Sequence, residues 1–103
     1  MTYEEASQKK KADRNRGIIM KIIEHFVTNE QGIHARPAML LVYAAKKYSS
    51  DITLWKGDKG VDLKDMFQVM RLSVNQNTAV RFEINGADEE EAAKEITELI
   101  TDL

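Results

Sequence analysis

Residues 79–86, AVRFEING, decide the fold of this chain because they read as a half-buried strand that ends in a turn. Apolar residues alternate there with charged ones: Val80, Phe82 and Ile84 with Arg81 and Glu83. This alternation is typical of an antiparallel strand with one face on the core and the other towards water. Asn85 and Gly86 then supply a turn.

The residues after this turn predict a long amphipathic helix. Its apolar side chains recur on one face: Ala92, Ile96, Leu99, Ile100 and Leu103. Asp88 and Glu91 have the spacing of a capping box at the first turn. The acidic residues at positions 89–91 suit the positive end of the helix dipole, so they need no catalytic explanation. The apolar face requires a sheet to cover it.

Towards the N-terminus, the sequence predicts a further strand and helix. β-Branched residues favour a strand over residues 21–27, where the apolar side chains, Phe26 included, are expected to begin the buried part of the chain. Residues 28–32 form a polar loop. A helix with Pro37 in its first turn then runs to about Tyr48. Helical spacing predicts its buried face at Ala38, Leu41, Val42 and Ala45.

Between these two units, the sequence predicts two short strands and a short helix. Residues 52–55 alternate in polarity, and a Gly-Asp pair at 57 and 58 turns the chain into a strand over residues 59–63. Asp65 stands where an N-cap belongs, ahead of a helix over residues 66–72. The order βαββαβα predicts an α+β fold with helices on one face of an antiparallel sheet.

Composition limits the classes of protein considered. The chain has 103 residues, no cysteine and a formal net charge of −2, which predicts one small domain without disulfides or thiol chemistry. We assign this domain to residues 20–103 and treat residues 1–19 as a charged N-terminal extension. The domain is acidic, so nucleic-acid binding is not expected. Short apolar runs and no signal-peptide pattern predict a soluble, cytoplasmic protein without membrane insertion.

Residues 32–38, GIHARPA, place a histidine at the start of a predicted helix with an arginine two residues on. A helix start offers free backbone N–H groups and the positive end of the helix dipole to an anion. His34 can therefore carry a phosphoryl group. A metal site is not expected, because His25 and His34 have no third convergent ligand, and His25 is predicted on the surface of its strand.

From about Met20 to Leu103 the chain resembles HPr, the histidine-containing phosphocarrier of the bacterial sugar phosphotransferase system. Four segments carry the resemblance at family-like spacing: GIHARPA at 32–38, SDITL at 50–54, VDLK at 61–64 and GAD at 86–88. The resemblance implies an open-faced β-sandwich with four antiparallel strands in the order 1-4-2-3 and three helices on one face. This agrees with the two layers predicted above.

The resemblance also implies a function. Enzyme I, charged by phosphoenolpyruvate, would phosphorylate His34 on Nδ1, and His34 would pass the group to enzyme IIA domains of sugar transporters. Arg36 is expected to neutralise the phosphoryl charge with a guanidinium that can contact two oxygens. Backbone N–H groups of Ala35 and Arg36 complete the cradle, to which Pro37 adds shape but no donor. We therefore expect a monomeric carrier without a cofactor rather than an enzyme.

An apolar docking patch for these partners is predicted around the histidine. Its candidate members are Met39, Leu40, Tyr43, Met66, Phe67 and Met70, with Lys46 and Lys47 at the rim. Methionine suits a surface that must fit several partners. From the pattern alone, completion of the core is an equally good interpretation of any one of them. The resemblance favours docking.

Asp65 is the main departure from the family pattern, because many members have a serine there that a dedicated kinase phosphorylates. A carboxylate carries less charge than a phosphate, so a helix N-cap explains Asp65 better than a permanent phosphoserine mimic does. Asp65 and the extension still motivate a second hypothesis. In it, the chain is a regulatory binding module that acts by contact on a transcription regulator, kinase or metabolic enzyme.

Overall fold

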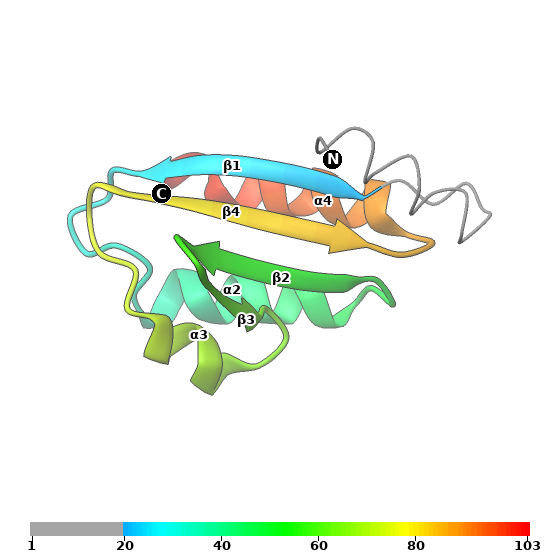
Figure 1. Cartoon of the computed structure of the whole chain (residues 1–103), viewed down its shortest axis with the longest axis horizontal. Helices are drawn as coiled ribbons and strands as arrows, with labels where there is room; N and C mark the ends of the chain where they lie inside the picture. Colours follow the sequence, from blue (N-terminus) through cyan, green and yellow to red (C-terminus); the bar gives the residue numbers. More distant parts are fainter. Residues whose placement is uncertain (1–19) are drawn as a thin grey trace.

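The computed structural model describes residues 20–103 as one antiparallel sheet with helices packed against it (Figure 1). Its elements are β1 (Lys21–Val27), α2 (Ala35–Lys46), β2 (Asp51–Lys56), β3 (Lys59–Asp62), α3 (Met66–Leu72), β4 (Thr78–Asn85), α4 (Glu89–Leu99) and a short 3₁₀ turn, η1 (Ile100–Asp102). The predicted order of strands and helices is confirmed. The assignment of residues 1–19 as an extension concerns residues outside this described part.

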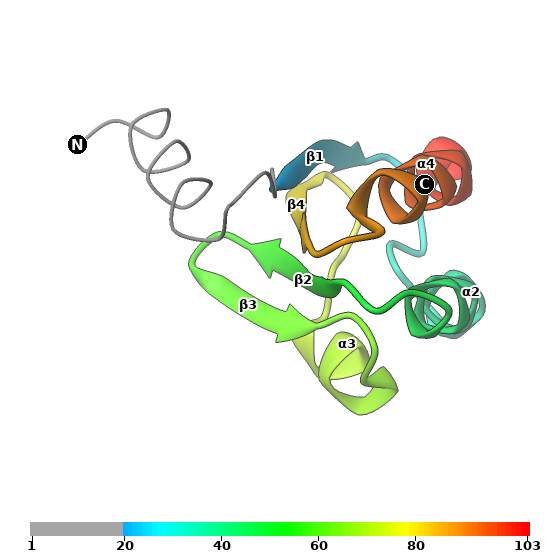
Figure 2. The ribbon, with the colours of Figure 1, turned by 90° about the vertical axis from the view of Figure 1, so that its right-hand side faces the viewer.

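The sheet has the order β1-β4-β2-β3, as predicted. Both neighbours of β4 are antiparallel to it, so Phe82 pairs with Ile23 on one side and with Leu54 on the other. Figure 2 shows α2 and α4 on one side of the strands, with α3 beside β3. The helices thus cover one face of the sheet, and no element within residues 20–103 covers the other.

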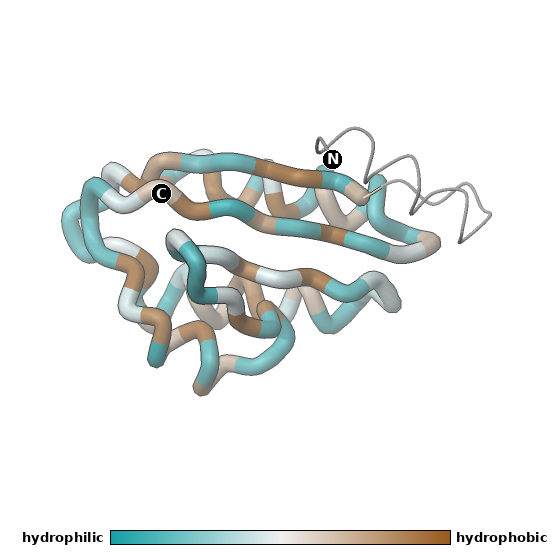
Figure 3. Tube along the Cα trace, viewed as in Figure 1, coloured by the Kyte–Doolittle hydropathy of each residue, from teal (hydrophilic) through white to brown (hydrophobic). Residues whose placement is uncertain are grey.

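The core lies between the strands and the helices. Its largest fully buried side chains include Phe82, Leu41, Ile52, Leu54, Leu63, Ile84 and Ile96. Figure 3 shows hydrophobic and hydrophilic residues alternating along β4, which is the pattern that the sequence predicted. The predicted inner face of α2 is also confirmed, since Ala38, Leu41, Val42 and Ala45 are all buried.

Two predictions for β1 are wrong, and the strand register explains both. His25 pairs with Val80, so its side chain lies on the helix-covered face of the sheet. The residue is half-buried. Its Nε2 atom is buried and has no hydrogen-bond partner among residues 20–103. Phe26 points to the opposite, open face and is 52% exposed. The apolar run at the start of the domain is therefore not all core.

The predicted capping box at Asp88 and Glu91 is also wrong. The carboxylate of Asp88 instead accepts hydrogen bonds from the backbone N–H groups of Ser49 and Ser50 and from the Ser50 hydroxyl. These bonds, the Ser50 hydroxyl first, lower the pKa of Asp88 to about 2. In the turn before α4, the Oε1 atom of Glu89 accepts from the N–H of Gly86 at 3.0 Å.

A second polar contact ties α2 to α4. Glu95 accepts from the Lys47 ammonium and from the Tyr48 hydroxyl, both at 2.6 Å. These bonds lower the pKa of Glu95 and raise the pKa of Tyr48 to about 12. Together with the bonds of Asp88, this contact fixes the C-terminal end of α2 and the loop after it against α4. The opposite end of α2 carries the candidate site.

Candidate functional site

A tight loop positions His34 at the start of α2. Gly32 has φ +63°, and a Cβ built there would lie 2.1 Å from the carbonyl oxygen of Val74. The next residue, Ile33, donates its N–H to the same oxygen at 2.9 Å and buries its side chain. Only glycine permits both the left-handed backbone and this close approach. The histidine loop is thereby fixed to the segment that joins α3 and β4.

His34 is the N-cap residue of α2, with an extended backbone at φ −87° and ψ −173°. Its carbonyl accepts the first helical hydrogen bond, from the N–H of Ala38 at 3.0 Å, but its side chain makes no capping bond. The imidazole is half-buried. Its ring nitrogens are therefore not engaged in capping the helix.

The first turn of α2 presents an anion-binding arrangement. The N–H groups of Ala35 and Arg36 lie in the first helical turn, where intrahelical acceptors are absent, and Pro37 has no N–H. No acidic residue lies in this turn, and Lys46 stands in the last turn. The positive end of the helix dipole therefore remains uncompensated beside His34. Arg36 is exposed and adds a full positive charge there.

The structure brings the predicted apolar residues of α2 and α3 onto two helices that contact each other. Most of them are well exposed: Met39 41%, Leu40 46%, Tyr43 62%, Phe67 81% and Met70 40%. Lys46 and Lys47 are exposed as well. Met66 differs, because it is half-buried and packs against the core. Completion of the core thus explains Met66 but not the other five, which form an exposed apolar surface.

Asp65 is the N-cap of α3, as the sequence predicted. Its carboxylate accepts from the backbone N–H of Gln68 at 3.2 Å and from the Gln68 side-chain amide at 3.1 Å. These hydrogen bonds, the backbone one first, lower the pKa of Asp65. The geometry supports a structural role at the start of α3.

Two features near the site had no signal in the sequence. The Val74 carbonyl fixes the histidine loop, although Val74 is distant from His34 along the chain. The Lys56 ammonium donates to the carbonyls of Leu72 and Ser73 at 3.0 and 2.9 Å, so it satisfies the C-terminal end of α3. Within residues 20–103 no cluster of three metal-ligating side chains occurs, and no helix could cross a membrane.

Comparison with known proteins assigns this chain to a family. The profile described as "PTS HPr component phosphorylation site" matches residues 23–102. A Mycoplasma histidine-containing phosphocarrier protein superposes with a TM-score of 0.77 at 30% identity, covering 80% of this chain and 93% of its own. HPr-C-His from Thermoanaerobacter tengcongensis gives 0.73 at 41% identity, covering 78% and 90%.

The catabolite repression protein Crh of Bacillus subtilis, whose crystal structure is described as a swapped, intertwined dimer, is also similar. It has a TM-score of 0.63 and 34% identity, covering 74% of this chain and 87% of its own. The chain belongs to the HPr family, the phosphocarrier proteins of the phosphotransferase system. The open-faced β-sandwich implied by the sequence is confirmed.

Proposed function

We propose that His34 accepts a phosphoryl group from enzyme I, which phosphoenolpyruvate has charged, and passes it to enzyme IIA domains of sugar transporters. One observation carries the proposal. A histidine whose side chain is not used for capping stands at a helix start that lacks acidic residues and presents the N–H groups of Ala35 and Arg36. That arrangement suits an imidazole that alternates between neutral and phosphorylated forms.

The transfer conserves atoms and electrons. A lone pair on one ring nitrogen of His34 attacks phosphorus, and the bond from phosphorus to the donor breaks with its electron pair left on the donor. The second ring nitrogen keeps its proton. Delivery to the acceptor repeats this sequence in reverse at His34. Because the N–P bond is reactive, the group leaves again without a separate activating step on the carrier.

Positive charge from the carrier assists each transfer. The Arg36 guanidinium can contact two phosphoryl oxygens, and the helix-start N–H groups of Ala35 and Arg36 supply further donors. Pro37 keeps the first turn in helical geometry without adding a donor. In-line positioning of the reacting nitrogens comes from the partner, so this chain acts as a carrier rather than as a catalyst.

The exposed side chains of Met39, Leu40, Tyr43, Phe67 and Met70 form the docking patch for these partners, with Lys46 at its rim. Their side chains are flexible or amphipathic, which suits a surface used by several proteins in turn. Tyr43→Ala and Phe67→Ala are therefore expected to slow transfer without unfolding the protein, since both side chains are mostly exposed. Met66→Ala should instead lower stability.

Incubation of the purified chain with enzyme I and phosphoenolpyruvate tests the proposal directly. We expect one acid-labile phosphoryl group in wild type, none in His34→Ala, and full labelling in His25→Leu, since the chain contains only these two histidines. Arg36→Ala should slow labelling more than Arg36→Lys, because lysine retains the charge but not the fork geometry. Labelling of His34→Ala, or none of the folded wild type, would contradict the proposal.

Absence of transfer with intact protein would point to the regulatory alternative, in which the chain acts by contact on a transcription regulator or metabolic enzyme. The role of Asp65 as an N-cap does not favour that alternative. We further propose a monomeric protein that acts in the cytoplasm without a cofactor. Sedimentation at several concentrations tests the monomer against the swapped dimer described for Crh.

A further inference from the structure

The open face of the sheet carries a charge pattern that the phosphocarrier site does not use. Strand register places four carboxylates on this face, those of Glu24, Asp51, Asp62 and Glu83, and one guanidinium, that of Arg81. Phe26 lies on the same face and is 52% exposed. A sheet face that combines exposed aromatic surface with excess negative charge is suited to a basic, partly apolar segment.

Part of this charge is already compensated around Trp55. The indole N–H of Trp55 donates to Glu83 at 3.0 Å, and the Arg81 guanidinium lies 5.4 Å from the ring centroid. Arg81 Nε is also 3.0 Å from the second Glu83 oxygen. The ring packs over Gly60, where a Cβ would approach it to 2.9 Å. The cluster is thus a fixed aromatic platform with no net charge.

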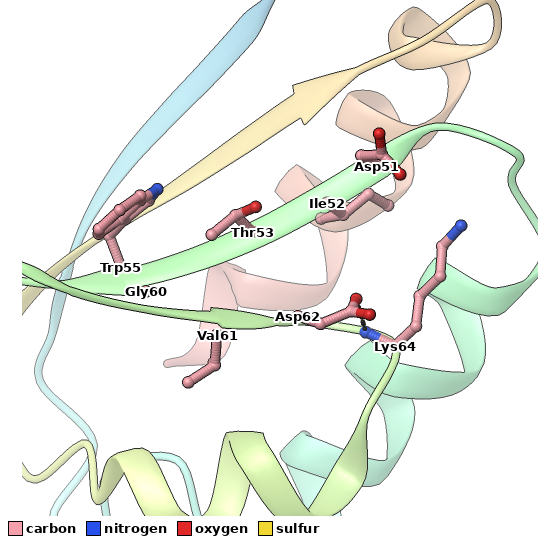
Figure 4. Close-up of a pocket in the computed structure, with 8 residues that line it drawn as sticks. All are labelled: Asp51, Ile52, Thr53, Trp55, Gly60, Val61, Asp62 and Lys64. Atoms are coloured by element: carbon pink, nitrogen blue, oxygen red, sulfur yellow. Dashed lines mark hydrogen bonds between the residues drawn. The ribbon is translucent and has the colours of Figure 1, made fainter.

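An excess of negative charge lies beside this platform. A shallow depression of about 500 Å³ lies beyond the Trp55 ring along β2 and β3, and its lining includes Asp51, Thr53, Asp62 and Lys64 (Figure 4). The Lys64 ammonium donates to the carbonyl of Tyr48 at 2.8 Å, and the two aspartates leave the depression with a net negative charge. Neither aspartate forms an ion pair within residues 20–103, and Glu24 on β1 forms none there either. A lysine or arginine side chain seated in the depression would meet two carboxylates and the edge of an aromatic surface.

The chain's own N-terminal segment has the matching chemistry. Residues 1–19 hold five basic residues, namely Lys9, Lys10, Lys11, Arg14 and Arg16, and three acidic ones, Glu4, Glu5 and Asp13, of which only Asp13 lies among the basic residues. A short linker, residues 17–20, joins these basic residues to β1, which contributes Glu24 and Phe26 to the open face. The basic residues of this segment complement the carboxylates of the open face, whereas an acidic protein surface would be repelled by them.

The geometry permits the contact. Lys21 pairs with Ile84, and Ile84 also pairs with Ile52, so the start of β1 lies at the same end of the sheet as Asp51. Two strand spacings, about 10 Å, separate these points. The four Cα–Cα steps from Arg16 to Met20 can span roughly 14 Å when fully extended. A tethered segment also acts at a high effective concentration, which an untethered partner lacks.

We propose that residues 1–19 dock on the open face of the sheet of the same chain, with their basic residues over Asp51 and Asp62. This contact is electrostatic and lies on the face opposite α2 and α4. It therefore leaves His34 accessible. It is also sensitive to salt, because the screening length falls to about 3 Å at 1 M salt.

The experiment uses the full chain, whose lack of cysteine allows one spin label at Ser7→Cys. We expect paramagnetic broadening of the amides of Thr53 and Asp62 but not of those of Tyr43 and Phe67 on the helical side. The broadening should be lost in 1 M salt and in the double variant Asp51→Asn, Asp62→Asn. The matched control Glu98→Lys, which changes charge on the exposed side of α4, should retain it.

Mixing separates the proposed occupant from a second copy. Spin-labelled chain without isotope is added to isotope-labelled chain without a spin label, so that only contacts between chains cause broadening. If the broadening in this mixture equals that in the chain that carries both the spin label and the isotope, the contact is between two chains. That result would overturn the proposal in favour of a dimer. Equal broadening of both faces, or none at Thr53 and Asp62, would overturn it as well.

Discussion

Gly32→Ala is the substitution that most directly tests how the histidine loop is held. The backbone at Gly32 has φ +63°, and an added Cβ would lie 2.1 Å from the Val74 carbonyl oxygen and 2.8 Å from the Asn75 Cα. Both are backbone atoms, so no side-chain rotation relieves the overlap. The loop must therefore move away from the segment between α3 and β4.

Three contributions set the size of the effect. The left-handed conformation costs an alanine about 1–2 kcal/mol. Separation of the two segments breaks the Ile33 N–H to Val74 carbonyl bond, with a net loss of about 1 kcal/mol. Partial exposure of Ile33, which is now 6% exposed, costs about 1 kcal/mol more. Gly32→Ala should therefore lower the free energy of unfolding by about 3–4 kcal/mol.

Gly57 provides a matched control. It has nearly the same backbone angle, φ +60°, but an added Cβ would meet nothing within 4 Å. Gly57→Ala should therefore cost only the conformational part, about 1–2 kcal/mol. Urea unfolding followed by the fluorescence of Trp55, the single tryptophan, measures both variants. Equal destabilisation would refute the argument, because the close approach to Val74 would then contribute nothing.

Three further predictions concern other parts of the fold. The folded pKa of Asp88 is about 2 against an ordinary 3.8, so its contribution is present above pH 3.8 and is lost as the pH falls towards 2; Asp88→Asn should flatten this part of the urea-midpoint profile. His25→Leu should raise the free energy of unfolding by about 1 kcal/mol, because it removes a buried nitrogen without a partner in residues 20–103; a lower urea midpoint would contradict this. Asp65→Ala should lower the urea midpoint and Asp65→Ser should largely restore it, since serine can also accept from the Gln68 N–H; equal midpoints would argue against the cap.

The sequence predicted those parts of the fold that depend on local periodicity. Alternation along β4 and helical spacing in α2 both report which side of an element is buried, and both predictions were confirmed. The error at β1 arose because polar His25 faces the helices while apolar Phe26 faces outwards. There the register, set by pairing with β4, overrides the pattern of side chains.

The same distinction applies to the site. His34 and Arg36 were predicted from a short motif, because a helix start that can bind an anion is a local structure. The Asp88 contact was missed because its partners, Ser49 and Ser50, lie in the loop before β2, and no local spacing links them to the start of α4. Contacts between distant segments leave no periodic signal, even where they fix the elements that carry a motif.

The contacts that position His34 are made by the backbone, whereas the proposed phosphoryl transfer would use its imidazole ring. His34 is positioned by backbone contacts, those of Gly32 and Ile33 with the loop after α3, and its side chain takes no part in capping α2. A carrier must meet donor and acceptor with the same surface, so any side-chain bond at the ring would have to break twice in each cycle. Positioning through the backbone avoids this requirement. On the proposed function, His34 would therefore need no change in its backbone contacts between receipt and delivery of the phosphoryl group.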